Sequence, residues 1–134
     1  MSFIPAAAIR IPAAALGSAV VAFMGAFSAL TAIRQAAGSE AWSGLMIAIP
    51  LIVALVPFLA GLVGGFISRS VWGVLASVGG ALVGLIASLS TLTGATIGPA
   101  DLLSMNLAAL ATIVMVTGLG HFVGVAVRMP GLVR

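Results

Sequence analysis

His121 is the only ionisable side chain inside the four long apolar runs of this chain, and Thr117 lies one helical turn before it. Ionisable groups within membrane segments are candidates for ligand binding or proton transfer. A metal site would need more ligands, and the chain has no second histidine and no cysteine. A haem would need an axial ligand from a partner chain. Because Arg128 follows two turns later, we favour a neutral imidazole bonded to Thr117 or a backbone carbonyl, with no cofactor and no metal.

Two prolines form the second candidate site. Pro50 and Pro57 are seven residues apart, so they share one face of a helix. Each removes a helical donor and frees the carbonyl one turn earlier, at Met46 and Val53. Freed carbonyls can coordinate an ion or form a hinge. The interpretation that we favour is a static kink satisfied by a neighbouring hydroxyl.

Catalysis has little support in the sequence. The chain has only two acidic residues, Glu40 and Asp101, and both lie at the opposite membrane surface from His121. No glycine-rich loop follows a strand, so no phosphate site is predicted. No carboxylate lies inside a span, which argues against an ion-coupled pump. We therefore expect no enzymatic activity.

The composition places these residues in a lipid bilayer. Hydrophobic residues make up 63% of the 134 residues and charged residues 5%, and mean hydropathy is +1.38. Seven charged side chains cannot cover the surface of a water-soluble fold of this size. The pI of about 11.8 reflects five arginines without a basic cluster, so no nucleic-acid partner is expected.

Four uncharged runs are long enough to cross the hydrocarbon core as helices, which takes about 20 residues. They lie between Arg10 and Arg34, between Glu40 and Arg69, over about Val71 to Thr91, and between Asp101 and Arg128. Pro12 suits a first turn, Ser39 or Ser43 a helix start, and Asp101 an N-cap. The runs do not alternate as strands would, so the predicted fold is an all-α integral membrane protein with four transmembrane helices.

The chain resembles a tandem repeat within a single membrane domain, residues 1–134. Residues 10–69 and 69–128 align without a gap at an offset of 59 residues. This composition would give about six or seven identities by chance. The 13 identical pairs are Arg10/Arg69, Leu16/Leu75, Ser18/Ser77, Ala22/Ala81, Gly25/Gly84, Leu30/Leu89, Ala36/Ala95, Ala41/Ala100, Met46/Met105, Leu51/Leu110, Gly61/Gly120, Gly65/Gly124 and Arg69/Arg128. Each copy is predicted to be a hairpin, and the two hairpins have the same orientation.

The arginines predict the orientation. With four spans, one membrane surface carries Arg10, Arg69, Arg128 and Arg134, and the other carries Arg34, Glu40 and Asp101. The positive-inside rule then places both termini in the cytoplasm. The absence of lysine and tyrosine suggests a GC-rich bacterial genome, so the expected location is the bacterial inner (plasma) membrane.

Small residues recur at helical spacing on every span. Such ridges let helix backbones approach closely, and this drives association in lipid. Candidate packing residues are Ser18, Ala22, Gly25, Gly61, Gly65, Ser77, Gly80, Gly84, Ser88, Gly120 and Gly124. The ridges serve packing within the monomer or contact with another chain. We expect at least one, with Gly80 and Gly84 the densest, to face another chain.

The first copy resembles the hairpin of rotary-ATPase proteolipids, the c-ring subunits. The matching residues are Ala32-Ile33-Arg34-Gln35 in the polar turn, then Ile49-Pro50, Ala54 and Gly61-Leu62-Val63. The ion-carrying carboxylate of that family corresponds to Leu55 and Val114, and the family faces its polar turn to the cytoplasm. The resemblance therefore implies tightly packed hairpins that assemble into rings or arrays, and no proton or sodium binding.

Together these observations predict a small, non-enzymatic membrane subunit that packs through small-residue helix faces. Its partners would be the lipid bilayer and other membrane subunits or copies of itself. The alternative is a small homo-oligomeric channel or transporter whose pathway passes Pro50, Pro57, Thr117 and His121. The scarcity of polar residues in mid-membrane favours the subunit, because a pathway needs groups that replace water.

Overall fold

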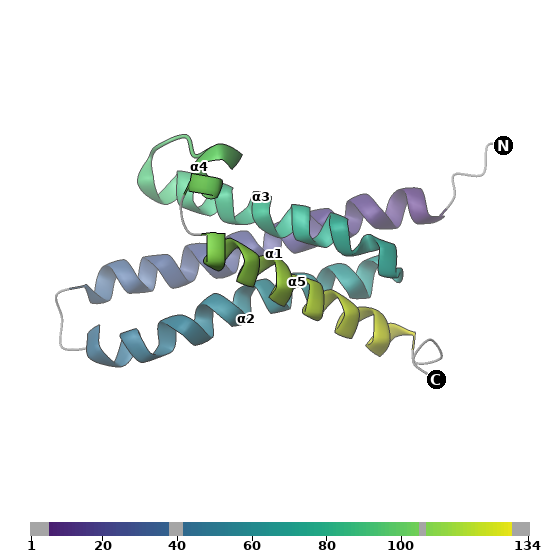
Figure 1. Cartoon of the computed structure of the whole chain (residues 1–134), viewed down its shortest axis with the longest axis horizontal. Coiled ribbons are helices and arrows are strands. Elements are labelled where there is room, and N and C mark those ends of the chain that lie inside the picture. The colour runs from purple at the N-terminus through teal and green to yellow at the C-terminus, as the bar shows by residue number, and fades with distance from the viewer. Residues whose placement is uncertain (1–5, 38–41, 105–106, 130–134) are drawn as a thin grey trace.

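The computed structural model describes residues 6–37, 42–104 and 107–129, and in this part of the chain every regular element is a helix (Figure 1). The elements are α1 (Ala6–Ala36), α2 (Trp42–Ser68), the short 3₁₀ helix η1 (Val71–Gly73), α3 (Val74–Thr93), α4 (Pro99–Ser104) and α5 (Leu107–Arg128). Four of the helical segments are long and apolar enough to cross a membrane. The prediction of an all-α protein with four candidate spans is confirmed.

Two predicted boundaries are wrong. Helix α1 begins at Ala6, so Pro12 lies inside the helix and not in its first turn. The proline leaves the carbonyl of Ala8 without its helical donor, but Ala8 is exposed near the helix end, where this costs little.

The fourth span also starts later than predicted. Asp101 belongs to the separate short helix α4, where its Oδ2 accepts the Gly98 N–H at 2.7 Å. This is the backward bond of a capping box, so Asp101 does act at a helix start, but at that of α4. The spanning helix α5 begins at Leu107. Of the two proposed caps for the second span, Ser39 lies outside the described residues and Ser43 is already within α2.

The helices pack as two parallel pairs joined by an antiparallel contact. The most extensive contacts join α2 to α5 and α1 to α3, followed by α1 to α2. Figure 1 shows α1 and α2 side by side, with α3 lying along α1 and α5 along α2. The start of α1 and the end of α5 lie at one end of the bundle, together with the turn between α2 and η1.

The interior is built from small and polar side chains. Ala22, Ala60 and Ala81 form the central apolar cluster. The largest fully buried side chains are His121, Thr117, Ser18, Ser77 and Ser88. Large apolar residues point outward: Leu16, Leu75 and Val127 are each about two-thirds or more exposed. This distribution suits a protein whose surroundings are apolar, because lipid solvates the outer side chains and close backbone contact stabilises the inside.

A two-residue turn joins α2 to η1. Arg69 follows the end of α2 in the left-handed region, with φ 52°, and its N–H donates to the carbonyl of Gly65. A left-handed residue just past a helix end satisfies one of the unpaired carbonyls there. The turn brings the carbonyl of the next residue, Ser70, against α5.

Candidate functional site

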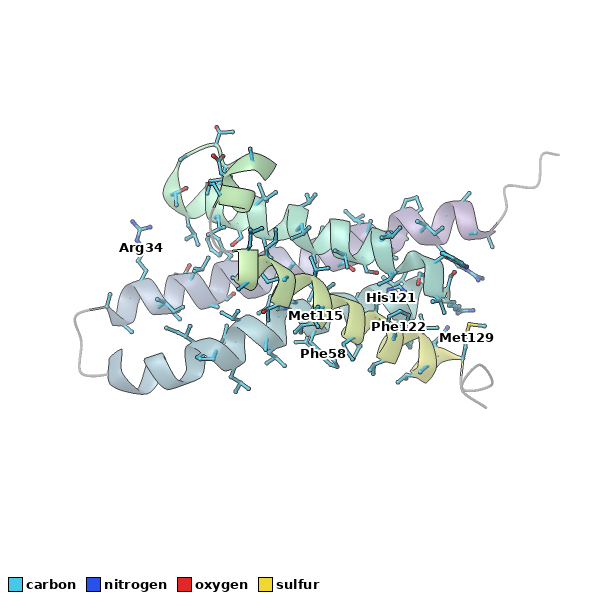
Figure 2. The ribbon with its side chains drawn as sticks, viewed as in Figure 1. Arg34, Phe58, Met115, His121, Phe122 and Met129 are labelled. Atoms are coloured by element: carbon cyan, nitrogen blue, oxygen red, sulfur yellow. The ribbon has the colours of Figure 1, made fainter. Side chains whose placement is uncertain are left out.

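His121 lies in α5 and is fully buried, and both of its ring nitrogens have partners. Nδ1 is 2.8 Å from the hydroxyl oxygen of Ser77 in α3. Nε2 is 2.9 Å from the carbonyl oxygen of Ser70 in the turn before η1. One imidazole therefore joins three separate segments of the chain. We call Ser68, Ser70, Gly73, Ser77 and His121 the His121 cluster (Figure 2).

The partners assign the protons of the ring. A carbonyl oxygen can only accept, so Nε2 carries a hydrogen and donates it to Ser70. In the neutral imidazole Nδ1 then accepts from the Ser77 hydroxyl. That hydroxyl also lies 3.2 Å from the carbonyl of Gly73. If Nδ1 gains a proton, the same two atoms stay bonded with the donor reversed, and the Ser77 hydroxyl turns to Gly73. The cluster can thus hold a neutral or a charged imidazole without moving a heavy atom.

The turn beside His121 is held by its own serines. The Ser68 hydroxyl donates toward the carbonyls of Gly65 and Ser70, and accepts from the N–H of Ser70, each at 3.3 Å. A side chain on Gly73 would meet Ser68 Cβ at 2.6 Å and His121 Cε1 at 3.2 Å, so the close approach requires glycine. His121 acts here as a clamp on the α2–α3 connection.

Thr117, predicted as a partner of His121, bonds elsewhere. Its hydroxyl donates to the carbonyl of Ile113, one turn earlier in the same helix, at 2.7 Å. The backbone carbonyl that the sequence analysis offered as the alternative partner of the imidazole is present, from Ser70.

The repeat-equivalent serines meet at the centre of the bundle. A Cβ on Gly64 of α2 would clash with the hydroxyls of both Ser18 and Ser77. Ser18 donates across the α1–α2 contact to the carbonyl of Ala60 at 2.9 Å. Ser77 bonds to His121 instead. The equivalent of His121 in the first copy is Leu62, which offers no polar atom, so the two serines have different partners.

The glycine ridges are occupied within the chain. A Cβ on Gly61 or Gly65 would strike the carbonyl of Thr117 or of His121 in α5. On the α5 side, Gly120 and Gly124 lie in the same way against the carbonyls of Phe58 and Leu62 in α2. The backbones of α2 and α5 are therefore in direct contact along two helical turns.

The Gly80 and Gly84 ridge, which we expected to face another chain, packs against α1 of the same chain. A Cβ at either position would strike the carbonyl of Ala15 or Ala19. Gly25 instead faces the side chain of Val56 in α2. Of the other predicted packing residues, Ser18, Ala22, Ser77 and Ser88 are all buried inside the bundle.

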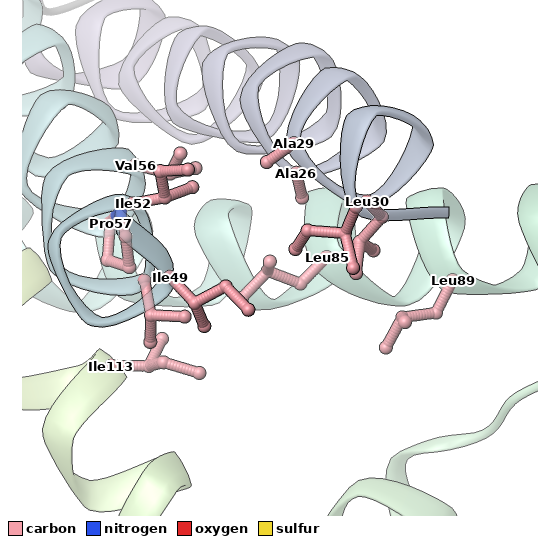
Figure 3. A pocket seen from close by; sticks show the side chains of 12 residues that line it. Ala26, Ala29, Leu30, Ile49, Ile52, Val56, Pro57, Leu85, Leu89 and Ile113 are labelled. Atoms are coloured by element: carbon pink, nitrogen blue, oxygen red, sulfur yellow. The ribbon is translucent and has the colours of Figure 1, made fainter. Parts of the chain in front are cut away.

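Towards the other end of the bundle the helices enclose a cavity of about 200 Å³, which we call the Pro57 cavity (Figure 3). All of its lining residues are apolar: Ala26, Ala29, Leu30, Ile33, Ile49, Ile52, Val53, Val56, Pro57, Leu85, Leu89 and Ile113. Pro57 is buried and lines the cavity, whereas Pro50, expected on the same face, is exposed. The two prolines therefore do not form one site.

The arginines lie at the two ends of the molecule. Arg10 and Arg69 are exposed, and the guanidinium of Arg128 sits 4.6 Å from the centre of the Phe66 ring, a cation–π contact between α5 and α2. Arg34, at the opposite end, donates from Nη1 to the carbonyl of Leu92 at 3.1 Å. Arg134 lies outside the described residues.

Sequence reasoning missed Ser68, Ser70 and Gly73 of the His121 cluster, and Gly64 between the two serines. Spacing along one helix cannot reveal partners that a turn brings in from another segment. The available signal was the concentration of serine and glycine over residues 64–77. No protein-family model, curated protein or solved structure matches the chain.

Proposed function

We propose that this chain is a non-enzymatic integral membrane subunit that packs with other membrane subunits or with copies of itself. The observation that carries the proposal is the separation of polar from hollow regions. The buried imidazole and the Ser77 hydroxyl are bonded to each other in one half of the bundle, and the Pro57 cavity in the other half is lined by apolar residues alone.

This separation favours a subunit over a channel or transporter. An ion or polar solute needs groups that replace its water along the whole pathway. The proposed pathway past Pro57 offers only hydrocarbon walls, and Pro50 is exposed on the outside of the bundle. His121 and Thr117 are fully buried and bonded to neighbouring groups.

The geometry of Ser77 and His121 also bears on catalysis. A serine hydroxyl 2.8 Å from an imidazole nitrogen resembles an activated nucleophile. Here both side chains are fully buried, and the second ring nitrogen is bonded to a carbonyl where a hydrolase would place a carboxylate. These features support a structural pair.

We also propose that residues 10–69 and 69–128 are two copies of one hairpin, related by an approximate two-fold axis along the membrane normal. Support comes from the α2–α5 contact, whose close approaches occur in equivalent pairs. Gly61 faces the carbonyl of Thr117, and Gly120 faces that of Phe58. Phe58 and Thr117 are themselves 59 residues apart, so each contact is the other with the copies exchanged.

For location we propose the bacterial inner membrane with both termini in the cytoplasm. Arg10 and Arg128 lie at the end where α1 begins and α5 ends, and Arg34 lies at the other. The resemblance to rotary-ATPase proteolipids contributes only the proposal of hairpins arranged in rings or arrays. Leu55 and Val114, at the positions of that family's carboxylate, are 48% and 37% exposed on the outer surface.

Two measurements test the proposed function. In native membranes solubilised with mild detergent, we expect the chain to migrate in an assembly larger than one chain. Reconstituted alone in liposomes, it should give no proton or sodium flux. A selective flux that Pro57→Ala or His121→Ala abolishes would instead establish the transporter. Reporters fused after Arg134 and inserted near Gly38 should report the cytoplasm and the outside, respectively, and the reverse would overturn the orientation.

A further inference from the structure

We propose that the Pro57 cavity holds one acyl chain of an anionic phospholipid from the surrounding bilayer, and that Arg34 binds its headgroup. The inference does not depend on which protein partners the chain has. It rests on the cavity, on the position of Arg34 and on the size of the opening.

The cavity has the chemistry of a hydrocarbon site. Apolar cavities of about 150 Å³ stay free of water and take apolar molecules. The Pro57 cavity is about 200 Å³, and α1, α2, α3 and α5 all contribute to its wall. Figure 3 shows Ala26 and Ala29 of α1 on one side and Ile113 of α5 on another. Because lipid surrounds the bundle, a lipid chain is the most abundant apolar group that can enter.

A charged group lies next to this apolar space. Leu30 and Leu89 line the cavity and also line a second hollow, together with Arg34, Leu92 and Thr93. The two hollows are therefore neighbours with shared walls, one wholly apolar and one carrying a guanidinium. This pairing matches an amphiphile with an apolar tail and an anionic head.

Arg34 is positioned to bind an anion. Its bond to the Leu92 carbonyl fixes Nη1 beside the end of α3, and the planar guanidinium has five N–H donors in a geometry that suits phosphate. The Thr93 hydroxyl next to it donates to the carbonyl of Leu89, so Arg34 supplies the anchor. The carboxylate of Asp101, in α4, is bonded to the N–H of Gly98.

The size of the cavity selects a lipid over a partner helix. A helix with its side chains is about 10–12 Å across, so it cannot enter a space of about 200 Å³. A single acyl chain is narrow and flexible enough to do so. A soluble anion would leave the apolar part empty.

The test uses the full chain, purified in mild detergent, with equal amounts of phosphatidylglycerol and phosphatidylcholine that carry identical acyl chains. Native mass spectrometry reports how many lipids stay bound and their ratio. We expect one retained lipid with a preference for phosphatidylglycerol. Arg34→Gln should lower that preference about fivefold, the effect of one arginine at an anionic surface. Arg34→Lys should restore most of it, and Arg10→Gln, at the other end, should change nothing.

A second pair of variants tests the cavity itself. Ala29→Phe should fill the space and remove the bound lipid of both kinds, while Ala32→Phe, exposed one turn later on α1, should retain it. If Ala29→Phe does not fold, Ile113→Phe decides the question, with its exposed neighbour Val114→Phe as control. Retention of phosphatidylglycerol at the wild-type ratio in a cavity-filling variant, or in Arg34→Gln, would overturn the proposal.

Discussion

The two halves of the bundle solve the packing problem in opposite ways. In the closed half, where α1 begins and α5 ends, glycines bring backbones into contact and polar side chains bond to one another. In the open half, where α1 and α3 end, the interior side chains are larger and leave the Pro57 cavity. Both halves are apolar outside, so the difference lies in residue size at the helix contacts.

This contrast shows what holds a small membrane bundle together. Lipid gives no hydrophobic force between helices, so stability comes from close contacts and from hydrogen bonds between segments. The closed half has both. The open half has few of either within the described residues, and its hollow is available to a bilayer component. The same substitution should therefore have different effects in the two halves.

The largest effect should come from the glycines between α2 and α5. Gly120→Ala places a methyl group against the carbonyl of Phe58, so a backbone must shift. Overpacking of this kind should cost about 3 kcal/mol of unfolding free energy. Gly118→Ala is the control on the same helix, because its Cβ would meet only Val74 Cγ2 at 3.9 Å. Reversible unfolding in mixed micelles measures both, and equal stability of the two variants would show that the close contact is absent.

A matched pair of alanines on α1 compares the halves directly. Ala22→Leu overfills the central alanine cluster and should destabilise the chain by about 2 kcal/mol. Ala29→Leu extends into the Pro57 cavity and should be neutral or stabilising. The same unfolding measurement applies. If both substitutions cost the same, the open half is as tightly packed as the closed half.

The bond between His121 and Ser77 should contribute less. A double-mutant cycle with His121→Ala and Ser77→Ala should give a coupling free energy of about 1 kcal/mol, within the range measured for hydrogen bonds between membrane helices. His121→Ala alone should cost more than Ser77→Ala, because it also leaves the Ser70 carbonyl without the imidazole. Additive effects of the two substitutions would mean that the side chains do not interact.

The smallest effect should come from Pro50. Its side chain is exposed, so Pro50→Ala should change stability by less than about 0.5 kcal/mol. Pro57→Ala should alter the shape of the cavity, because Pro57 is buried in its wall. Loss of bound lipid from the second variant but not the first would distinguish the two prolines.

The sequence predicted the helices better than their contacts. Length and composition were enough for the four candidate spans, since only long apolar helices satisfy the backbone in lipid. Spacing also identified the small residues that lie between helices, such as Gly61 and Gly120. It could not tell which helix each ridge would meet, because a ridge at Gly84 suits an internal neighbour and a partner chain equally. Nor could it place Ser70 beside His121, since that contact depends on the left-handed turn at Arg69.

The most direct test of the central claim, that the small-residue ridges are used within one chain, compares Gly84→Leu with Gly79→Leu. Both glycines lie in α3, but a Cβ on Gly84 would strike the carbonyl of Ala19, and one on Gly79 would meet nothing within 4 Å. Unfolding of the isolated chain, measured in detergent at high dilution, should show a large loss of stability for Gly84→Leu and none for Gly79→Leu. If Gly84→Leu leaves the isolated chain as stable as the wild type but releases it from its native assembly, the ridge faces another chain and the account is contradicted.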